Sequence, residues 1–124
     1  HEGQNWEAMQ TAAAWNLDNL VAIVDRNMLS MDGPTETTTI PLEPLSDKWN
    51  SFNWSVETID GHNIKDILST FEKLPFQNGK PSVIIANTIK GKGISFIENK
   101  AEWHRNELTE DQYKQAIEEI TAKL

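Results

Sequence analysis

No cysteine occurs among the 124 residues of this chain. The chain therefore has neither a disulfide framework nor thiolate chemistry, which is compatible with a reducing, cytoplasmic compartment. Basic residues are also few: 11 Lys and Arg stand against 19 Asp and Glu, and the net charge is −8. Because the basic residues are scattered, we expect no nucleic-acid partner and no anionic membrane surface. No apolar run approaches about 20 residues, so we expect no membrane span.

The length suits one small domain with a single core. Apolar periodicity predicts helices and strands in alternation. The predicted helices cover residues 2–17, 42–52, 64–74 and 109–124, and the predicted strands cover residues 20–24, 54–59 and 82–88. Strands that alternate with helices favour a parallel sheet. We therefore predict an α/β fold of three layers, with helices on both faces of a mainly parallel sheet.

Local signals mark several boundaries of these elements. Ser46 and Asn63 are candidate N-caps, and Thr109 followed by Gln112 predicts a capping box. Residues 34–41 are rich in Thr and Pro, so we expect an extended loop there.

Residues 20–24 (LVAIV) form a continuous apolar run, which predicts a strand buried on both faces. Asp25 and Asn27 follow where this strand ends, and Asp32-Gly33 predicts a turn. Ligands of open α/β sheets bind beyond the carboxyl ends of the strands. Two interpretations stand. Either Asp25 and Asn27 only cap the strand, or Asn27 and nearby carbonyls hold a hard cation such as Mg²⁺.

Three predicted strand ends, at residues 25–27, 60–62 and 88–93, should lie at one edge of such a sheet. They would place oxygen ligands, a histidine and two lysines where a phosphorylated ligand with a divalent cation binds. Lys90 and Lys92 alternate with glycine in the last of these loops. They either meet phosphate as point charges or are solvated loop residues.

Three further residues are open to two interpretations each. His104, beside Trp103, is either a partly buried surface residue or a group that titrates or binds phosphate near neutral pH. Glu2 and Glu7 lie about 140° apart around an ideal helix, so they do not share one face. They are typical of the acidic residues that the dipole favours at a helix start.

Five segments together resemble a known family. In chain order they are HEGQNWEA, VDRNMLSMDG, TIDGHN, KPSVIIANTIKGKGISFIE and EWH. They are similar to transketolase, most of all to the diphosphate-binding domain of the split, two-subunit transketolases. The resemblance runs from His1 to about Leu108, and its specificity lies in the whole series.

The resemblance implies thiamine diphosphate and Mg²⁺ as cofactors. Asn27 matches a Mg²⁺ ligand of the family, and Leu29 matches the position whose backbone carbonyl completes the protein ligands. Leu29 and Met31 match apolar positions near the cofactor. His104 is similar to the family histidine that contacts the diphosphate near the substrate channel, which makes it the candidate catalytic residue.

The resemblance also implies an assembly. Glu2 and Glu7 match acidic residues where two subunits meet, so it favours interface residues over helix-start acids. We expect a dimer, with a second subunit or further domains that carry the pyrimidine-binding part. The implied activity is transfer of a two-carbon ketol unit between sugar phosphates of the pentose phosphate type. The alternatives are another thiamine-diphosphate enzyme, such as a deoxyxylulose-phosphate synthase or a dihydroxyacetone synthase, or a non-catalytic association module.

The chain departs from the family pattern in two places. The Gly-Asp-Gly that should stand just before His1 is absent, and Arg105 stands where glycine often follows the histidine. We therefore expect residues 1–124 to be the C-terminal portion of a thiamine-diphosphate-binding domain. We also expect this piece to be inactive alone and to self-associate through a strand edge that lacks its neighbour.

Overall fold

The computed structural model describes residues 1–123. They form two compact units, each described here by itself. The sheet unit comprises His1–Arg26 and Leu42–Thr88, and the loop unit comprises Asn27–Pro41 and the described part of Ile89–Leu124. None of the helices in the described residues is long and apolar enough to cross a bilayer.

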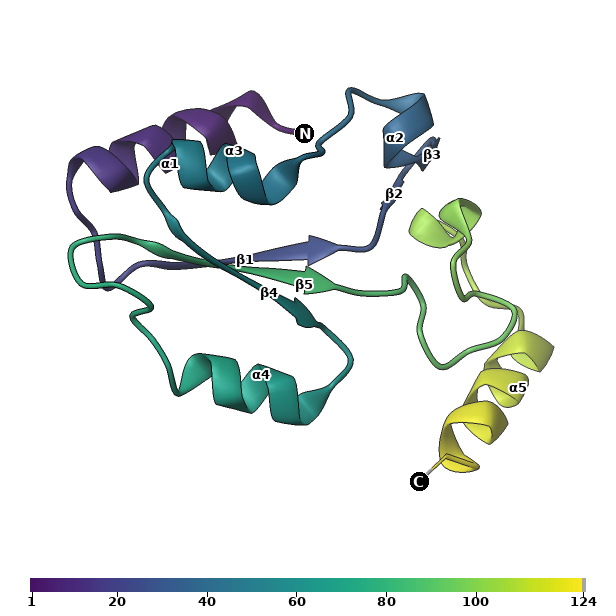
Figure 1. Cartoon of the computed structure of the whole chain (residues 1–124). Coiled ribbons are helices and arrows are strands. Elements are labelled where there is room, and N and C mark those ends of the chain that lie inside the picture. Colours follow the sequence, from purple (N-terminus) through teal and green to yellow (C-terminus); the bar gives the residue numbers. More distant parts are fainter. Residues whose placement is uncertain (124) are drawn as a thin grey trace. The chain divides into compact units, whose positions relative to one another are not determined.

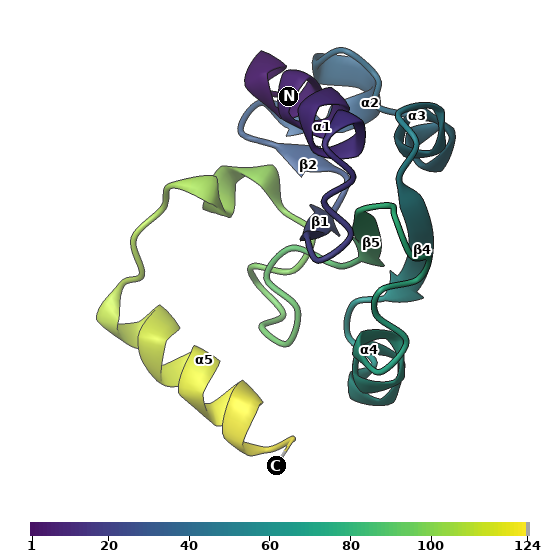
Figure 2. The same cartoon turned by 90° about the vertical axis from the view of Figure 1, so that its left-hand side faces the viewer.

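The sheet unit is built on three parallel strands in the order β1-β5-β4. Helices α1 and α3 cover one face of this sheet and α4 covers the other (Figures 1 and 2). Its elements are α1 (Gly3–Ala14), β1 (Val21–Arg26), α3 (Leu45–Ser51), β4 (Ser55–Asp60), α4 (Ile64–Phe71) and β5 (Ser82–Asn87). The predicted three layers and parallel sheet are confirmed.

The core of the sheet unit lies between the sheet and the α1–α3 layer. The central strand β5 is buried from Ser82 to Ala86, with Val83, Ile84 and Ile85 at most 1% exposed. Met9 and Ala12 of α1 and the two tryptophans Trp49 and Trp54 complete this core. Burying one such aliphatic side chain stabilises the fold by about 1.5–3 kcal/mol, so β5 holds the unit together.

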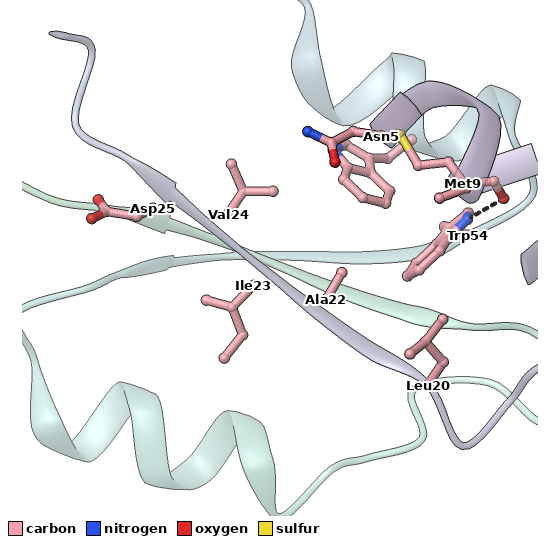
Figure 3. Close-up of a pocket in the computed structure, with 10 residues that line it drawn as sticks. Asn5, Met9, Leu20, Ala22, Ile23, Val24, Asp25 and Trp54 are labelled. Carbon is pink, nitrogen blue, oxygen red and sulfur yellow. Dashed lines mark hydrogen bonds between the residues drawn. The ribbon is translucent and has the colours of Figure 1, made fainter. Parts of the chain in front are cut away.

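The prediction that the first strand is buried on both faces is wrong. β1 lies at the edge of the sheet, and its side chains alternate in exposure along the strand. Val24 and Ile23 point to opposite sides of the strand (Figure 3). Ile23 remains 59% exposed because α4 packs against β4, at the other edge of the sheet.

The loop unit carries elements too short to show a periodic pattern. Two-residue strands form an antiparallel hairpin, with Met31 and Asp32 as its turn. The elements are β2 (Leu29–Ser30), β3 (Gly33–Pro34), α2 (Thr35–Thr38), a 3-10 helix η1 (Ala101–His104) and α5 (Glu110–Thr121). The turn was predicted, whereas the hairpin and η1 were not.

Two local predictions need correction. Residues 34–41 do not form an extended loop, because the Thr38 and Thr39 hydroxyls donate to carbonyls four residues earlier, at 2.8 and 2.7 Å, and support α2. Ser46 does not cap α3. Pro44 is the N-cap, and the carboxylate of Glu43 accepts the Leu45 N–H at 3.0 Å.

The other capping predictions are confirmed. The Asn63 side chain accepts from the backbone N–H groups of Lys65 and Asp66, and Thr109 and Gln112 form the capping box of α5. α1, α4 and α5 are shorter than predicted because turns follow them, and α3 begins three residues later than predicted, after Pro44. The predicted end of the last helix at Leu124 lies outside the described residues.

Candidate functional site

The carboxyl ends of the three parallel strands meet at one edge of the sheet unit, as predicted. Arg26 ends β1 and Asp60 ends β4, and both are in register with Asn87 at the end of β5. The Arg26 guanidinium donates to Asn87 Oδ1 at 2.9 Å and to Glu43 Oε1 at 2.7 Å. Charge-assisted hydrogen bonds between the protein's own side chains therefore stabilise this edge of the sheet.

Asp25 has a defined partner at the same edge. Its carboxylate accepts a hydrogen bond from the Thr88 hydroxyl, which joins the ends of β1 and β5. The first interpretation of Asp25, as a residue that secures the strand end, thus has direct support.

The turn after β4 is built by its own polar groups. Asp60 Oδ1 accepts the His62 backbone N–H at 2.9 Å, and the Gly61 N–H donates to the Asn87 carbonyl at 2.8 Å. The Asp60 carboxylate therefore shapes the turn.

A hollow of about 480 Å³ lies alongside β1 (Figure 3). Its walls are mostly apolar and come from α1, β1 and the two core tryptophans, with Asn5 and Asp25 among the few polar groups. The Trp54 indole N–H donates to the Met9 carbonyl at 2.9 Å, which fixes one wall. Such a hollow accepts apolar groups rather than a diphosphate.

The loop unit holds the residues that the resemblance assigned to the cofactor. Asn27 is half-buried, and its Oδ1 accepts the Leu29 N–H at 2.9 Å. Met28 between them has φ of 61°, and its carbonyl accepts the Thr35 N–H at 3.0 Å. The Asn27 amide is thus fixed at the start of the hairpin, and its oxygen keeps a second lone pair for another partner. Met31 lies in the hairpin turn, 49% exposed.

His104 ends η1, which packs against both β2 and β3. The histidine side chain is exposed and belongs to no apolar core. The structure therefore brings η1 with His104 against the hairpin that carries Leu29, within one compact unit.

The two lysines of the glycine-rich segment differ. Lys92 Nζ lies 3.3 Å from Glu98 Oε1, so Lys92 has a partner inside its own loop. The Glu98 carboxylate also accepts the Gly93 N–H, and this hydrogen bond, with the contribution of Lys92, lowers the pKa of Glu98. For Lys92 the interpretation as an ordinary loop residue gains support, and Lys90 is half-buried.

Glu2 and Glu7 are both exposed at the amino-terminal part of α1. Glu2 occupies the N-cap position but makes no capping hydrogen bond with its side chain, and α1 has no acidic residue in its first turn. The position of Glu2 is therefore compatible with an acid favoured by the helix dipole, whereas Glu7 lies beyond the first turn, where the dipole acts.

The structure also shows polar residues that the sequence did not single out. The carboxylate of Glu119 accepts from Ser95, and the buried Glu36 Oε1 has no hydrogen-bond partner among the described residues. No local sequence pattern indicates either residue. The Glu119 contact joins positions 24 residues apart, and Glu36 is distinguished only by its burial in the fold.

An open parallel sheet with polar loops beyond its strand ends is the architecture of a ligand-binding α/β domain. A family model described as "Transketolase, thiamine diphosphate binding domain" matches residues 1–123. The chain belongs to this family, as the resemblance predicted.

Relatives and solved structures agree with this assignment. The 6-deoxy-6-sulfo-D-fructose transketolase subunit SqwG of Clostridium sp. (strain MSTE9) is 49% identical over 119 residues, which are 96% of this chain and 43% of that protein. An apulose-4-phosphate transketolase subunit of Phocaeicola vulgatus is 40% identical over 123 residues, 99% of this chain and 43% of that protein. The crystal structure of transketolase from Campylobacter jejuni superposes with a TM-score of 0.86 at 29% identity, over 97% of this chain and 18% of that one. The chain thus spans less than half the length of these proteins.

Proposed function

We propose that this chain is the C-terminal portion of the thiamine-diphosphate-binding domain of a transketolase, and that the full-length protein transfers a two-carbon ketol unit between sugar phosphates. The family assignment over residues 1–123 and the similarity to two transketolase subunits support this. The observation that carries the proposal is the loop unit, in which η1 with His104 packs on the hairpin that follows Asn27.

Asn27 and Leu29 would hold Mg²⁺. An amide oxygen and a backbone carbonyl are the oxygen ligands that Mg²⁺ accepts. The fixed Asn27 amide, with one lone pair engaged by the Leu29 N–H, fits such a role. Among residues 1–123 no group of three His, Cys, Asp or Glu side chains could hold a metal. We assign the remaining ligands to the diphosphate, to water and to the aspartate of the Gly-Asp-Gly that the resemblance implies.

Thiamine diphosphate supplies the carbanion chemistry when bound, and the protein supplies binding, orientation and electrostatics. Leu29 and Met31, at the start and turn of the hairpin, would give apolar contact to the cofactor. His104 would donate a hydrogen bond to a phosphate oxygen, and such charge-assisted bonds are the stronger kind. Its exposure leaves the imidazole accessible for that contact.

The full-length protein would work as an assembly in the cytoplasm. We assign the pyrimidine-binding part to a second subunit, because two of the relatives are named as transketolase subunits. Glu2 and Glu7 are exposed on α1 and would lie at the interface of a dimer.

The test is a coupled assay of ketol transfer by the full-length protein with its second subunit, with and without thiamine diphosphate and Mg²⁺. The donor panel includes a ketose phosphate and 6-deoxy-6-sulfo-D-fructose, since relatives carry both kinds of substrate in their names. Cofactor-dependent transfer to an aldose phosphate is expected. Condensation of pyruvate with an aldose phosphate, without ketol transfer, would instead identify a deoxyxylulose-phosphate synthase.

His104→Ala tests the histidine in the same assay. The variant should raise the apparent constants for the cofactor or the donor sugar, while the melting temperature barely changes because the side chain is exposed. Unchanged kinetics with a large loss of melting temperature would show that His104 is structural.

A further inference from the structure

The glycine-rich loop (residues 89–98) is fixed to α5 by a carboxylate. Glu119 accepts both the Ser95 backbone N–H and the Ser95 hydroxyl, each at 2.6 Å. Gln115, one turn earlier on α5, donates to the same carboxylate at 2.7 Å. These three hydrogen bonds, led by that from the Ser95 hydroxyl, lower the pKa of Glu119 to about 2, so the anchor is charged at neutral pH.

A second contact, from Lys123 just beyond the end of α5, secures the same loop two residues earlier. Lys123 Nζ donates to the Gly93 carbonyl at 2.7 Å, and the Gly93 N–H donates to Glu98. The Gly93 N–H and carbonyl lie outside any helix or strand, and charged side chains supply their hydrogen-bond partners. The loop also packs on itself, because a Cβ on Gly91 would lie 2.4 Å from Ile97 Cγ2.

The anchored loop leads directly to η1. Phe96, next to Ser95, packs edge-on against Trp103, with 5.5 Å between the ring centroids. Trp103 precedes His104, and both belong to η1. Edge-on aromatic contacts of this kind are favourable, so the pair links the anchored loop to the residue that precedes His104.

We propose that Glu119 is a positioning residue for His104. It fixes Ser95, Phe96 then holds Trp103, and η1 presents the imidazole in one orientation. This inference rests on the proposed contact between His104 and the diphosphate. It assigns to α5 an indirect part in cofactor binding, through Ser95 and η1.

The experiment compares variants of the full-length protein by calorimetry with thiamine diphosphate at saturating Mg²⁺. Glu119→Ala should weaken binding several-fold, and by less than His104→Ala does, because Glu119 acts on the imidazole only through the loop and η1. Glu119→Gln should recover part of this, since its amide oxygen still accepts from Ser95. Glu118→Ala, the neighbouring exposed acid on α5, is the matched control and should leave the affinity unchanged. Glu119→Ala should have no further effect in a His104→Ala background.

A second measurement follows the ring of His104 without cofactor. The proton–nitrogen NMR signals of its imidazole should shift in Glu119→Ala and stay in place in Glu118→Ala. Equal weakening by Glu119→Ala in both backgrounds, or unshifted His104 signals, would overturn the inference. If His104→Ala alone binds cofactor like the wild type, the proposed function of His104 fails, and the NMR comparison still decides whether Glu119 positions the ring.

Discussion

Replacing Gly61 by alanine should destabilise the sheet unit, because the turn after β4 lies against the end of β5. The Gly61 N–H donates to the Asn87 carbonyl at 2.8 Å, and this hydrogen bond holds the turn close to β5. A Cβ there would lie 2.5 Å from Thr88 Cγ2 and 3.1 Å from both Ala86 Cβ and the Asn87 carbonyl oxygen.

The expected cost follows from these distances. Carbon atoms pack best at about 3.5–4.0 Å, so the Thr88 methyl group must move by about 1 Å. Ala86 is buried in the central strand, and the Asn87 carbonyl accepts the Gly61 N–H, so neither is free to follow the methyl group. Insertion of one methyl group into such packing costs about 1–3 kcal/mol, and we expect about 2 kcal/mol for Gly61→Ala.

Native-state hydrogen exchange of the β5 amides in the full-length protein measures this free energy. Thr88→Ser in the Gly61→Ala background should recover part of the loss, because it removes the methyl group and keeps the hydroxyl that bonds Asp25. Gly3→Ala is the control, since no heavy atom lies within 4 Å of its added Cβ. Equal exchange protection in Gly61→Ala and wild type would refute the steric argument.

Three other predictions concern hydrogen bonds. Trp54→Phe should lower the free energy of unfolding by about 1–2 kcal/mol, because it removes the hydrogen bond from the indole N–H to the Met9 carbonyl. A smaller loss than the same substitution causes at an exposed tryptophan would contradict this. The pKa of Glu43 is lowered, first by the hydrogen bond from the Leu45 backbone N–H. The ionised carboxylate therefore stabilises the fold above the ordinary pKa of 4.5, and this stabilisation is lost as the pH falls below that value through the lowered pKa. The melting temperature of Glu43→Gln should therefore lie below wild type at pH 7 and approach it in acid; a constant difference would show that charge is irrelevant. NMR titration of Glu119 should give a pKa of about 2, and Ser95→Ala should raise it toward 4.5.

Much of the sheet unit could be predicted from local sequence. The buried run of β5, the strand β4 and the cap at Asn63 all depend on residues close in the chain, and all are confirmed. The same holds for the Thr109 capping box in the loop unit. The burial of β1 was mispredicted because an apolar run indicates only that a strand favours burial, not which position it takes in the sheet. Its place at the sheet edge depends on which elements pack beside it.

The candidate site could be predicted only in part. The gathering of strand ends followed from the topology of parallel sheets. The hairpin after Asn27 is too short for any periodicity, and η1 has only four residues. The contact of Glu119 with Ser95 joins residues 24 positions apart, so no local pattern indicates it. The roles of Asn27 and His104 come from the resemblance and stay predictions.

The measurement that tests the central claim most directly is the Mg²⁺ dependence of thiamine diphosphate binding by the full-length protein. Calorimetry should show that Asn27→Ala needs at least about tenfold more Mg²⁺ for half-saturation than the wild type, because one of few protein oxygen ligands is lost. Asn27→Asp, which keeps an acceptor for the Leu29 N–H and adds charge, should retain binding, and Asn78→Ala in an exposed loop should behave as wild type. An unchanged Mg²⁺ requirement in Asn27→Ala would contradict the assignment of the loop unit as the cofactor-binding part of this chain.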